Sequence, residues 1–266
     1  MKSALILLYK TVRCRSLLML IIVCNSVSFV HAENTLKVCL EDGYWYPFTY
    51  VEDGKPLGVH LDVVREAVNS LGMDIRFVSM PWARCLKENE LGRLDGVIGV
   101  SYQDERAEYL HFPVDAVANG VSIRRIMQVE YVVVTVANSN YEFNGDINSI
   151  PAPILVPKGY SVGIELREQG LIVDDSERGD IFNINKLIKD KRGSVVVIRE
   201  LVEFLSLRDE YKGRLKISKK AIMSKSYFLA FSKKSKLSIP VRHSIWDSIS
   251  SVRDNSVLME ELLRKY

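Results

Sequence analysis

The feature that most constrains the fold of this chain is an alternation of short apolar strands with amphipathic helices. Residues 35–40 are predicted to form an apolar strand, and apolar residues then recur at helical spacing up to Leu71, where Gly72 ends the helix. Further strands are predicted over 75–78 and 96–100, separated by a helix from Pro81 to Leu91. This order is typical of a parallel sheet with crossover helices.

A second cycle of strands and helices begins near Glu130. The strands are predicted over 131–136, 154–156, 171–173, 195–198 and 227–231, and the helices over 161–169, 185–189 and 201–207. In the last strand we expect side chains to alternate between outward and inward positions. The segment from Pro240 to Tyr266 is predicted to form two helices. The chain therefore contains two consecutive α/β units without a disordered tether.

The first 32 residues have the composition of a secretory signal. They contain four basic residues and no acidic residue, and the apolar run 17–23 precedes a small-residue cleavage pattern at Val30–Ala32. The run is shorter than the roughly 20 apolar residues that span a bilayer. We therefore predict a cleaved signal peptide over 1–32 and an exported, soluble mature chain, with an uncleaved anchor as the alternative.

The charge of the chain argues against nucleic acid as a partner. The formal net charge is +3, but without the signal 32 basic residues face 33 acidic ones. A nearly neutral body has no broad basic surface for a phosphate backbone.

Two cysteines, Cys39 and Cys85, remain after the signal. In an oxidising compartment they either pair as a disulfide or lie apart as small buried side chains. A catalytic cysteine is not expected, because no histidine neighbours either one.

The residues that follow the strands are the candidates for a ligand site, because small ligands bind at the carboxyl ends of strands in open α/β sheets. The loop 42–48 holds three consecutive aromatic residues, of which some should line a cleft unless the loop packs on its own domain. Trp82 follows the second strand, where it either lines the same cleft or packs in the core.

Two further strand ends carry groups suited to an anion. Arg106 follows the third strand and offers a planar fork for a carboxylate, the alternative being a surface ion pair with Asp104 or Glu108. In the second unit, glycine and tyrosine precede Ser161, which begins a predicted helix. That helix start is a dipolar site for a ligand, or Ser161 caps the helix, and the two roles are compatible.

Six short motifs occur in one order along the first unit. They are Leu36–Cys39, the aromatic-Pro-Phe loop ending at Phe48, Gly58–Asp62, Pro81–Trp82, Gly92–Gly96 and the block from Ser101 to Arg106. Their order and spacing resemble the bacterial extracellular solute-binding proteins of family 3. The resemblance implies a two-lobed α/β fold of the type II periplasmic-binding-protein kind, each lobe a mostly parallel sheet flanked by helices. Lobe 1 would comprise 33–127 and 233–266, lobe 2 would comprise 128–232, and two crossing strands would join them.

The same resemblance implies roles for individual residues. Trp45 and Trp82 would sandwich the ligand, and Arg106, with Ser101 and the backbone near Gly99, would hold its α-carboxylate. The other implied contacts are Asp42 at the mouth of the site and Gly159, Tyr160 and Ser161 closing from lobe 2. In that fold Cys39 and Cys85 would be near neighbours, which favours a disulfide.

One position departs from the pattern of the family. Amino-acid receptors of this kind place an aspartate in lobe 2 to hold the ligand's ammonium, and here that position falls near Ile198, with Glu200 the nearest acid. A ligand that has a carboxylate but no ammonium, or a ligand whose amine is held elsewhere, fits this sequence equally well.

The expected function is that of a monomeric periplasmic solute-binding protein. It would capture an amino acid or related carboxylate by lobe closure and deliver it to an ABC-type permease or a sensor kinase, without a cofactor or metal. The alternative is a dehydratase-like enzyme on the same scaffold, with Glu41, Asp42 and His60 as its candidate acid–base groups.

Overall fold

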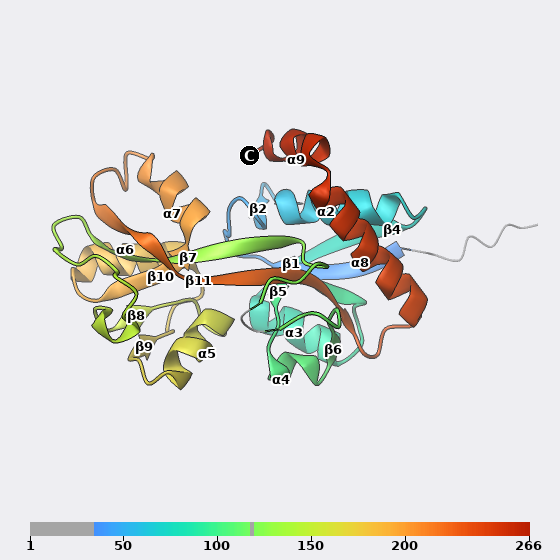
Figure 1. The fold of residues 1–266 in the computed structure, drawn as a ribbon, viewed down its shortest axis with the longest axis horizontal. Helices are drawn as coiled ribbons and strands as arrows, with labels where there is room; N and C mark the ends of the chain where they lie inside the picture. Colours follow the sequence, from blue (N-terminus) through green and yellow to red (C-terminus); the bar gives the residue numbers. More distant parts are fainter. Residues whose placement is uncertain (1–34, 118–119) are drawn as a thin grey trace, which may run out of the picture. The chain divides into compact units, whose positions relative to one another are not determined.

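One mixed sheet is the framework of the computed structural model, which describes residues 35–117 and 120–266 (Figure 1). In this part of the chain the sheet has nine strands in the order β4-β1-β5-β11-β7-β10-β8-β9, with β6 pairing to β11 beside this path. The strands are β1 (Thr35–Glu41), β4 (Asp74–Met80), β5 (Gly96–Ser101), β6 (Leu110–His111), β7 (Met127–Val136), β8 (Ile154–Leu155), β9 (Val173–Asp174), β10 (Ser194–Ile198) and β11 (Leu215–Ser232). A separate hairpin joins β2 (Tyr50–Glu52) to β3 (Lys55–Leu57).

The two ends of the sheet are parallel and its middle is antiparallel. At one end β1 pairs in parallel with β4 and β5, and at the other end β8 pairs in parallel with β9 and β10. Between them, β11 and β7 lie antiparallel to each other and to their outer neighbours. The polypeptide therefore crosses between the two ends twice, in β7 and in β11.

Helices cover both faces of each end of the sheet (Figure 1). The helices are α2 (Val59–Asn69), α3 (Trp82–Glu90), α4 (Asp104–Ala107), α5 (Ser161–Glu168), α6 (Asp180–Asp190), α7 (Arg199–Ser206), α8 (Ile239–Asp254) and α9 (Ser256–Leu263), with a 3-10 turn η1 at Ile147–Ser149. We call the end with β1–β6, α2–α4, α8 and α9 lobe 1, and the end with β8–β10 and α5–α7 lobe 2. The architecture is the two-lobed type expected from the sequence, while the exact residue boundaries of the lobes remain a prediction.

The C-terminal helices return to lobe 1 and pack against α2. The hydroxyl of Ser248 on α8 donates to the carbonyl of Ala67 at 3.0 Å, and α2 buries an apolar stripe that includes Val64 and Val68.

Gly58 precedes α2 at φ 130°, and a Cβ there would lie 2.1 Å from the carbonyl oxygen of Phe48. Only glycine allows the aromatic loop and the start of α2 to approach so closely.

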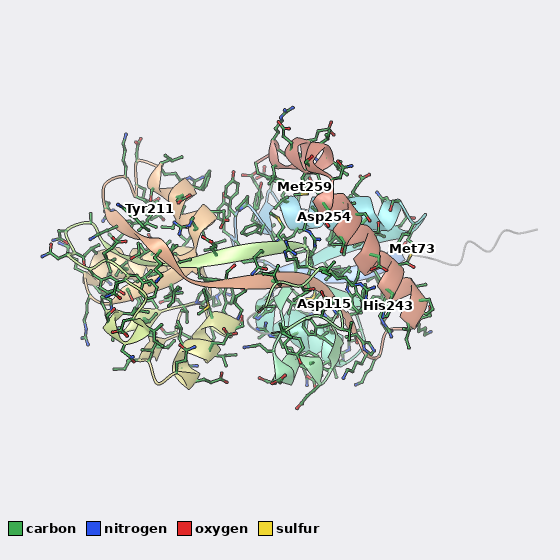
Figure 2. All side chains as sticks on the ribbon, viewed as in Figure 1. Met73, Asp115, Tyr211, His243, Asp254 and Met259 are labelled. Carbon is green, nitrogen blue, oxygen red and sulfur yellow. A yellow bond between two sulfur atoms is a disulfide. The ribbon has the colours of Figure 1, made fainter. Side chains whose placement is uncertain are left out.

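Side chains fill the space between sheet and helices in both lobes (Figure 2). Tyr211 is buried in lobe 2, and Met259 on α9 is buried in lobe 1.

Among the described residues, no helix combines the length and the apolarity needed to cross a bilayer. The predicted signal peptide, residues 1–32, lies outside the described residues.

The expected alternation in the last strand is wrong. All side chains from Tyr227 to Phe231 are buried, because β11 lies in the centre of the sheet with helices on both of its faces. A strand buried on both faces shows a continuous apolar run rather than an alternating one.

Several predicted elements have different bounds, most of all the strand expected over 227–231, which extends over Leu215–Ser232. The first helix ends at Asn69, so that Leu71 lies beyond it and is 40% exposed. The strand expected over 171–173 forms only at Val173–Asp174, and the helix expected over 185–189 begins earlier, at Asp180.

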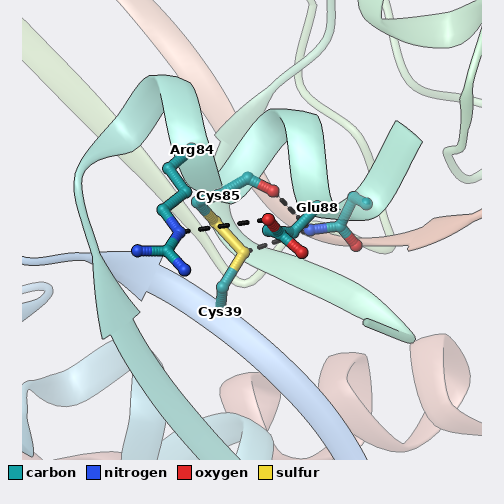
Figure 3. The surroundings of a disulfide bond; sticks show 5 residues. Cys39, Arg84, Cys85 and Glu88 are labelled. Atoms are coloured by element: carbon teal, nitrogen blue, oxygen red, sulfur yellow. Dashed lines mark hydrogen bonds and ion pairs between the residues drawn. A yellow bond between two sulfur atoms is a disulfide. The ribbon is translucent and has the colours of Figure 1, made fainter. Parts of the chain in front are cut away.

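Cys39 on β1 and Cys85 on α3 are joined by a disulfide, with their Cα atoms 5.8 Å apart (Figure 3). The side chain of Asn89 donates to the carbonyl of Cys85 at 2.9 Å and to the sulfur of Cys39 at 3.1 Å. The bridge attaches α3 to the central strand of lobe 1 and so fixes the helix that begins at Trp82.

Candidate functional site

A small hollow of about 30 Å³ lies where β1 and β5 end and α5 begins. It has walls from both lobes. Its lining residues are Glu41, Trp45, Thr49, Trp82, Ile98, Gly99, Ser101, Arg106, Tyr160, Ser161 and Tyr227. Of the residues predicted from the sequence to bind a ligand, all but Asp42 and Gly159 line this hollow.

Arg106 is the charged centre of the small hollow. Its side chain is 4% exposed, although it follows β5 by only a few residues. One guanidinium nitrogen donates to the carbonyl and hydroxyl oxygens of Ser101 at 3.1 and 3.2 Å, and the other donates to the carbonyl of Gly159 at 3.2 Å. Burial lowers the pKa of Arg106, but arginine remains charged in proteins. The alternative of a surface ion pair with Asp104 or Glu108 is therefore wrong.

The Gly159 carbonyl of lobe 2 accepts two donors from lobe 1. Besides Arg106, the indole nitrogen of Trp82 donates to it at 3.3 Å. The guanidinium of Arg106 also lies over the Trp82 ring, 5.4 Å from its centroid, a cation–π geometry. Gly159 itself does not line the hollow, but its carbonyl orients both side chains.

Ser161 connects the hollow to a buried ion pair. Its hydroxyl is 2.7 Å from the Ser101 hydroxyl and accepts from the Lys225 ammonium at 2.9 Å. Lys225, on β11, is fully buried and pairs with Glu165 on α5. The Ser161 side chain does not cap α5, so the interpretation of it as a plain N-cap is wrong.

The three aromatic residues of the loop after β1 take three different positions. Trp45 lines the small hollow, but it is 5% exposed because its ring packs on His60 and Tyr227. Tyr44 lines a second, larger hollow, and Tyr46 stacks on Phe204 of lobe 2 with ring centroids 4.1 Å apart.

Gly99 lies beside this aromatic packing, in β5 at φ 71°. A Cβ there would make only ordinary contacts of 3.7–3.8 Å with Thr49, His60 and Trp45. The positive φ alone therefore favours glycine at this strand position.

His60 is a core residue rather than an acid–base group. It is fully buried, and neither ring nitrogen has a hydrogen-bond partner among the described residues. Burial lowers its pKa to about 3, so the ring is neutral at physiological pH.

The larger hollow, of about 570 Å³, lies between the lobes and shares Glu41 and Trp82 with the small one. Lobe 1 contributes 41–44 and 81–83 to its walls, and lobe 2 contributes 158 and 178–182. Asp42, predicted at the mouth of the site, is exposed and lines only this larger hollow.

Two carboxyl groups, Glu41 from lobe 1 and Asp180 from lobe 2, line the larger hollow. Glu41 accepts a hydrogen bond from the Tyr160 hydroxyl, and burial raises its pKa to about 7 despite that bond. Asp180, the first residue of α6, is 4% exposed, and burial together with the charge of Glu41 raises its pKa to about 8. Asp180 was missed because the sequence pattern places the start of α6 five residues too late.

These raised pKa values predict a stability that falls as pH rises. Between pH 5 and 8 the folded protein holds more protons on Glu41 and Asp180 than the unfolded chain does. For each unit by which the pH increases, the free energy of unfolding therefore falls by up to about 1.4 kcal/mol per group. Urea unfolding of Asp180→Asn at several pH values should show a shallower decline than the wild type. Asp190→Asn, an exposed carboxylate at the other end of α6, is the matched control. An equal slope in Asp180→Asn and the wild type would contradict the assignment.

The residues that the family pattern suggested for an ammonium do not line either hollow. Ile198 is fully buried at the end of β10. Burial raises the pKa of Glu200, and one of its carboxylate oxygens is buried without a hydrogen-bond partner among the described residues. No group of His, Cys, Asp and Glu within residues 35–117 and 120–266 is arranged to hold a metal ion.

Comparisons with known proteins find one matching sequence family and many similar folds. The sequence model of the bacterial extracellular solute-binding proteins, family 3, matches residues 36–223. No curated protein matches the sequence. Among solved structures, the glutamate-bound GluR0 ligand-binding core from Nostoc punctiforme is similar at TM-score 0.67 and 17% identity, covering 87% of this chain and 98% of that one.

Two further solved structures are similar over most of their length. The arginine-, lysine- and histidine-binding protein ArtJ from Geobacillus stearothermophilus has TM-score 0.66 and 18% identity, with 87% of this chain and 94% of that chain covered. A histidine kinase sensor domain described as similar to periplasmic binding proteins has TM-score 0.70 and 15% identity, with coverages of 87% and 95%. At these identities the likeness shows the fold.

Proposed function

Because the chain belongs to the bacterial extracellular solute-binding proteins of family 3, we propose that it captures an amino acid or a closely related carboxylate between its two lobes. The family is one of binding proteins, and the structural neighbours include the substrate-binding protein of an amino acid ABC transporter. The chain would act in the periplasm and hand its solute to an ABC-type permease or a sensor.

The observation that carries this proposal is the buried Arg106 guanidinium at the boundary of the lobes. It is fixed by Ser101 from lobe 1 and by the Gly159 carbonyl from lobe 2. A guanidinium held in this way forms paired hydrogen bonds with a carboxylate, which are stronger than those between neutral groups. A ligand that touches both lobes binds their closed arrangement best, so its capture stabilises closure.

Two of the three candidate acid–base groups lie away from Arg106, which supports binding without catalysis, while the third, Glu41, lines both hollows and accepts a hydrogen bond from Tyr160. His60 lies outside both hollows and has no carboxylate partner among the described residues. Asp42 lines only the larger hollow, away from Arg106. General acid–base catalysis needs such groups within hydrogen-bond reach of the reacting atoms.

A thermal-shift screen of amino acids, dicarboxylates and polyamines tests the proposal. A carboxylate ligand at about 100 times its Kd should stabilise the protein by about 2.7 kcal/mol. For a chain of this size that corresponds to roughly 5–10 °C in Tm. The decarboxylated amine of each amino acid that responds is the control and should give no shift. The proposal fails if no carboxylate raises Tm, or if the amines are as effective.

A further inference from the structure

The two hollows share two lining residues and differ in the other charged groups that line them. Arg106 lines only the small hollow and Asp180 lines only the large one, while Glu41 and Trp82 line both. A ligand whose carboxylate meets Arg106 would therefore extend past Trp82 toward Asp180.

Asp180 lines the larger hollow, and its carboxyl group has an oxygen without a hydrogen-bond partner among the described residues. Its side chain is 4% exposed, and its Oδ1 is buried without a hydrogen bond to any described residue. Burying an unpaired polar oxygen is costly, so such a group in a binding site indicates a contact that a ligand completes.

Glu41 adds a second carboxyl group from the opposite lobe. The Tyr160 hydroxyl holds it in place by donating to Oε2. The larger hollow also includes Lys158 and Arg178, but both are exposed, whereas Asp180 is buried. Asp180 is therefore the buried charged group of the larger hollow, whereas Asp42, Lys158 and Arg178 are exposed.

We propose that Asp180 and Glu41 form a subsite for the side-chain guanidinium or ammonium of a basic amino acid whose carboxylate is bound at Arg106. This inference rests on the proposed function and adds the class of solute. The volume of about 570 Å³ at the acidic end, against about 30 Å³ at Arg106, suits a ligand with a small anionic end and a long cationic side chain. A cation replaces the protons that burial otherwise keeps on the two carboxyl groups near neutral pH.

Calorimetry with L-arginine and L-citrulline tests the subsite, because the two differ mainly in the charge of the side-chain end group. L-lysine and L-norleucine form the equivalent pair for an ammonium. At pH 7.5 the wild type should bind the charged member of at least one pair tenfold or more tightly than the neutral one. Binding of the charged member should release protons, measured in buffers of different ionisation enthalpy, and binding of the neutral member should not.

Variants assign this preference to the two carboxyl groups. Asp180→Asn and Glu41→Gln should each reduce the affinity for the charged ligand at least tenfold, leave the neutral one within threefold, and reduce proton release. Unchanged binding of the neutral ligand shows that the variants are folded. Asp190→Asn, on the same helix as Asp180 and exposed, should keep the full preference.

The outcomes separate the two proposals. If the screen finds no carboxylate ligand at all, the proposed function fails and the subsite with it. If carboxylates bind but the neutral member of each pair binds as well as the charged one, or Asp180→Asn keeps the preference, the subsite is overturned and the proposed function stands.

Discussion

Replacing Arg106 with alanine should weaken binding of the best amino-acid ligand from the thermal-shift screen by about 30-fold or more. Truncating one partner of a buried, hydrogen-bonded charge pair costs about 2–5 kcal/mol, much of it because the other charge loses its partner. Arg106 is 4% exposed and lies against Trp82, so a ligand carboxylate there would be largely desolvated. Calorimetric titration of the purified variant measures the change.

Two further variants separate charge from geometry at this position. Arg106→Lys keeps the positive charge but loses the planar fork that joins Ser101 and Gly159, so its affinity should be intermediate. Arg84→Ala removes an exposed arginine from α3 and should bind like the wild type. If Arg106→Ala kept wild-type affinity, the ligand carboxylate would have to be bound elsewhere.

Replacing Lys225 with methionine should lower the free energy of unfolding by about 3–5 kcal/mol, because removing one member of a buried ion pair leaves the other charge without compensation. Lys225 is fully buried in β11, pairs with Glu165 and donates to Ser161 at 2.9 Å. Urea unfolding followed by circular dichroism measures the loss.

A double variant and a matched control show whether the ion pair is the cause. Lys225→Met combined with Glu165→Gln should recover part of the loss, because no unpaired charge then remains. Lys216→Met changes a lysine in the same strand whose ion pair with Glu142, at 3.9 Å, is half-exposed, so it should cost about 1 kcal/mol or less. Equal losses in Lys216→Met and Lys225→Met would contradict the assigned role of the buried pair.

The parts of the site that follow parallel strands could be predicted from the sequence. Ser101 ends β5, Arg106 follows in α4, and Trp82 begins α3 shortly after β4, so the topology of a parallel sheet brings them to one edge. The first strands and helices of lobe 1 could be predicted from local patterns, chiefly apolar strands and the glycines that follow the helices.

Other parts of the site depend on contacts that no local pattern encodes. Lys225 and Glu165 are 60 residues apart, and a lysine in a strand is normally expected at the surface. Asp180 was missed because the first turn of α6 carries polar as well as apolar residues, so the periodicity becomes clear only further along the helix. The burial of both side-chain faces from Tyr227 to Phe231 follows from the central place of β11, which depends on strands far away in the sequence.

The most direct test of the account is a crystal structure of the protein with the amino acid that stabilises it most in the thermal-shift screen. The account predicts the ligand carboxylate within about 3 Å of the Arg106 guanidinium, a usual length for a charge-assisted hydrogen bond, with Trp82 and the start of α5 also in contact with the ligand. A ligand bound away from Arg106, or held by one lobe alone, would contradict it.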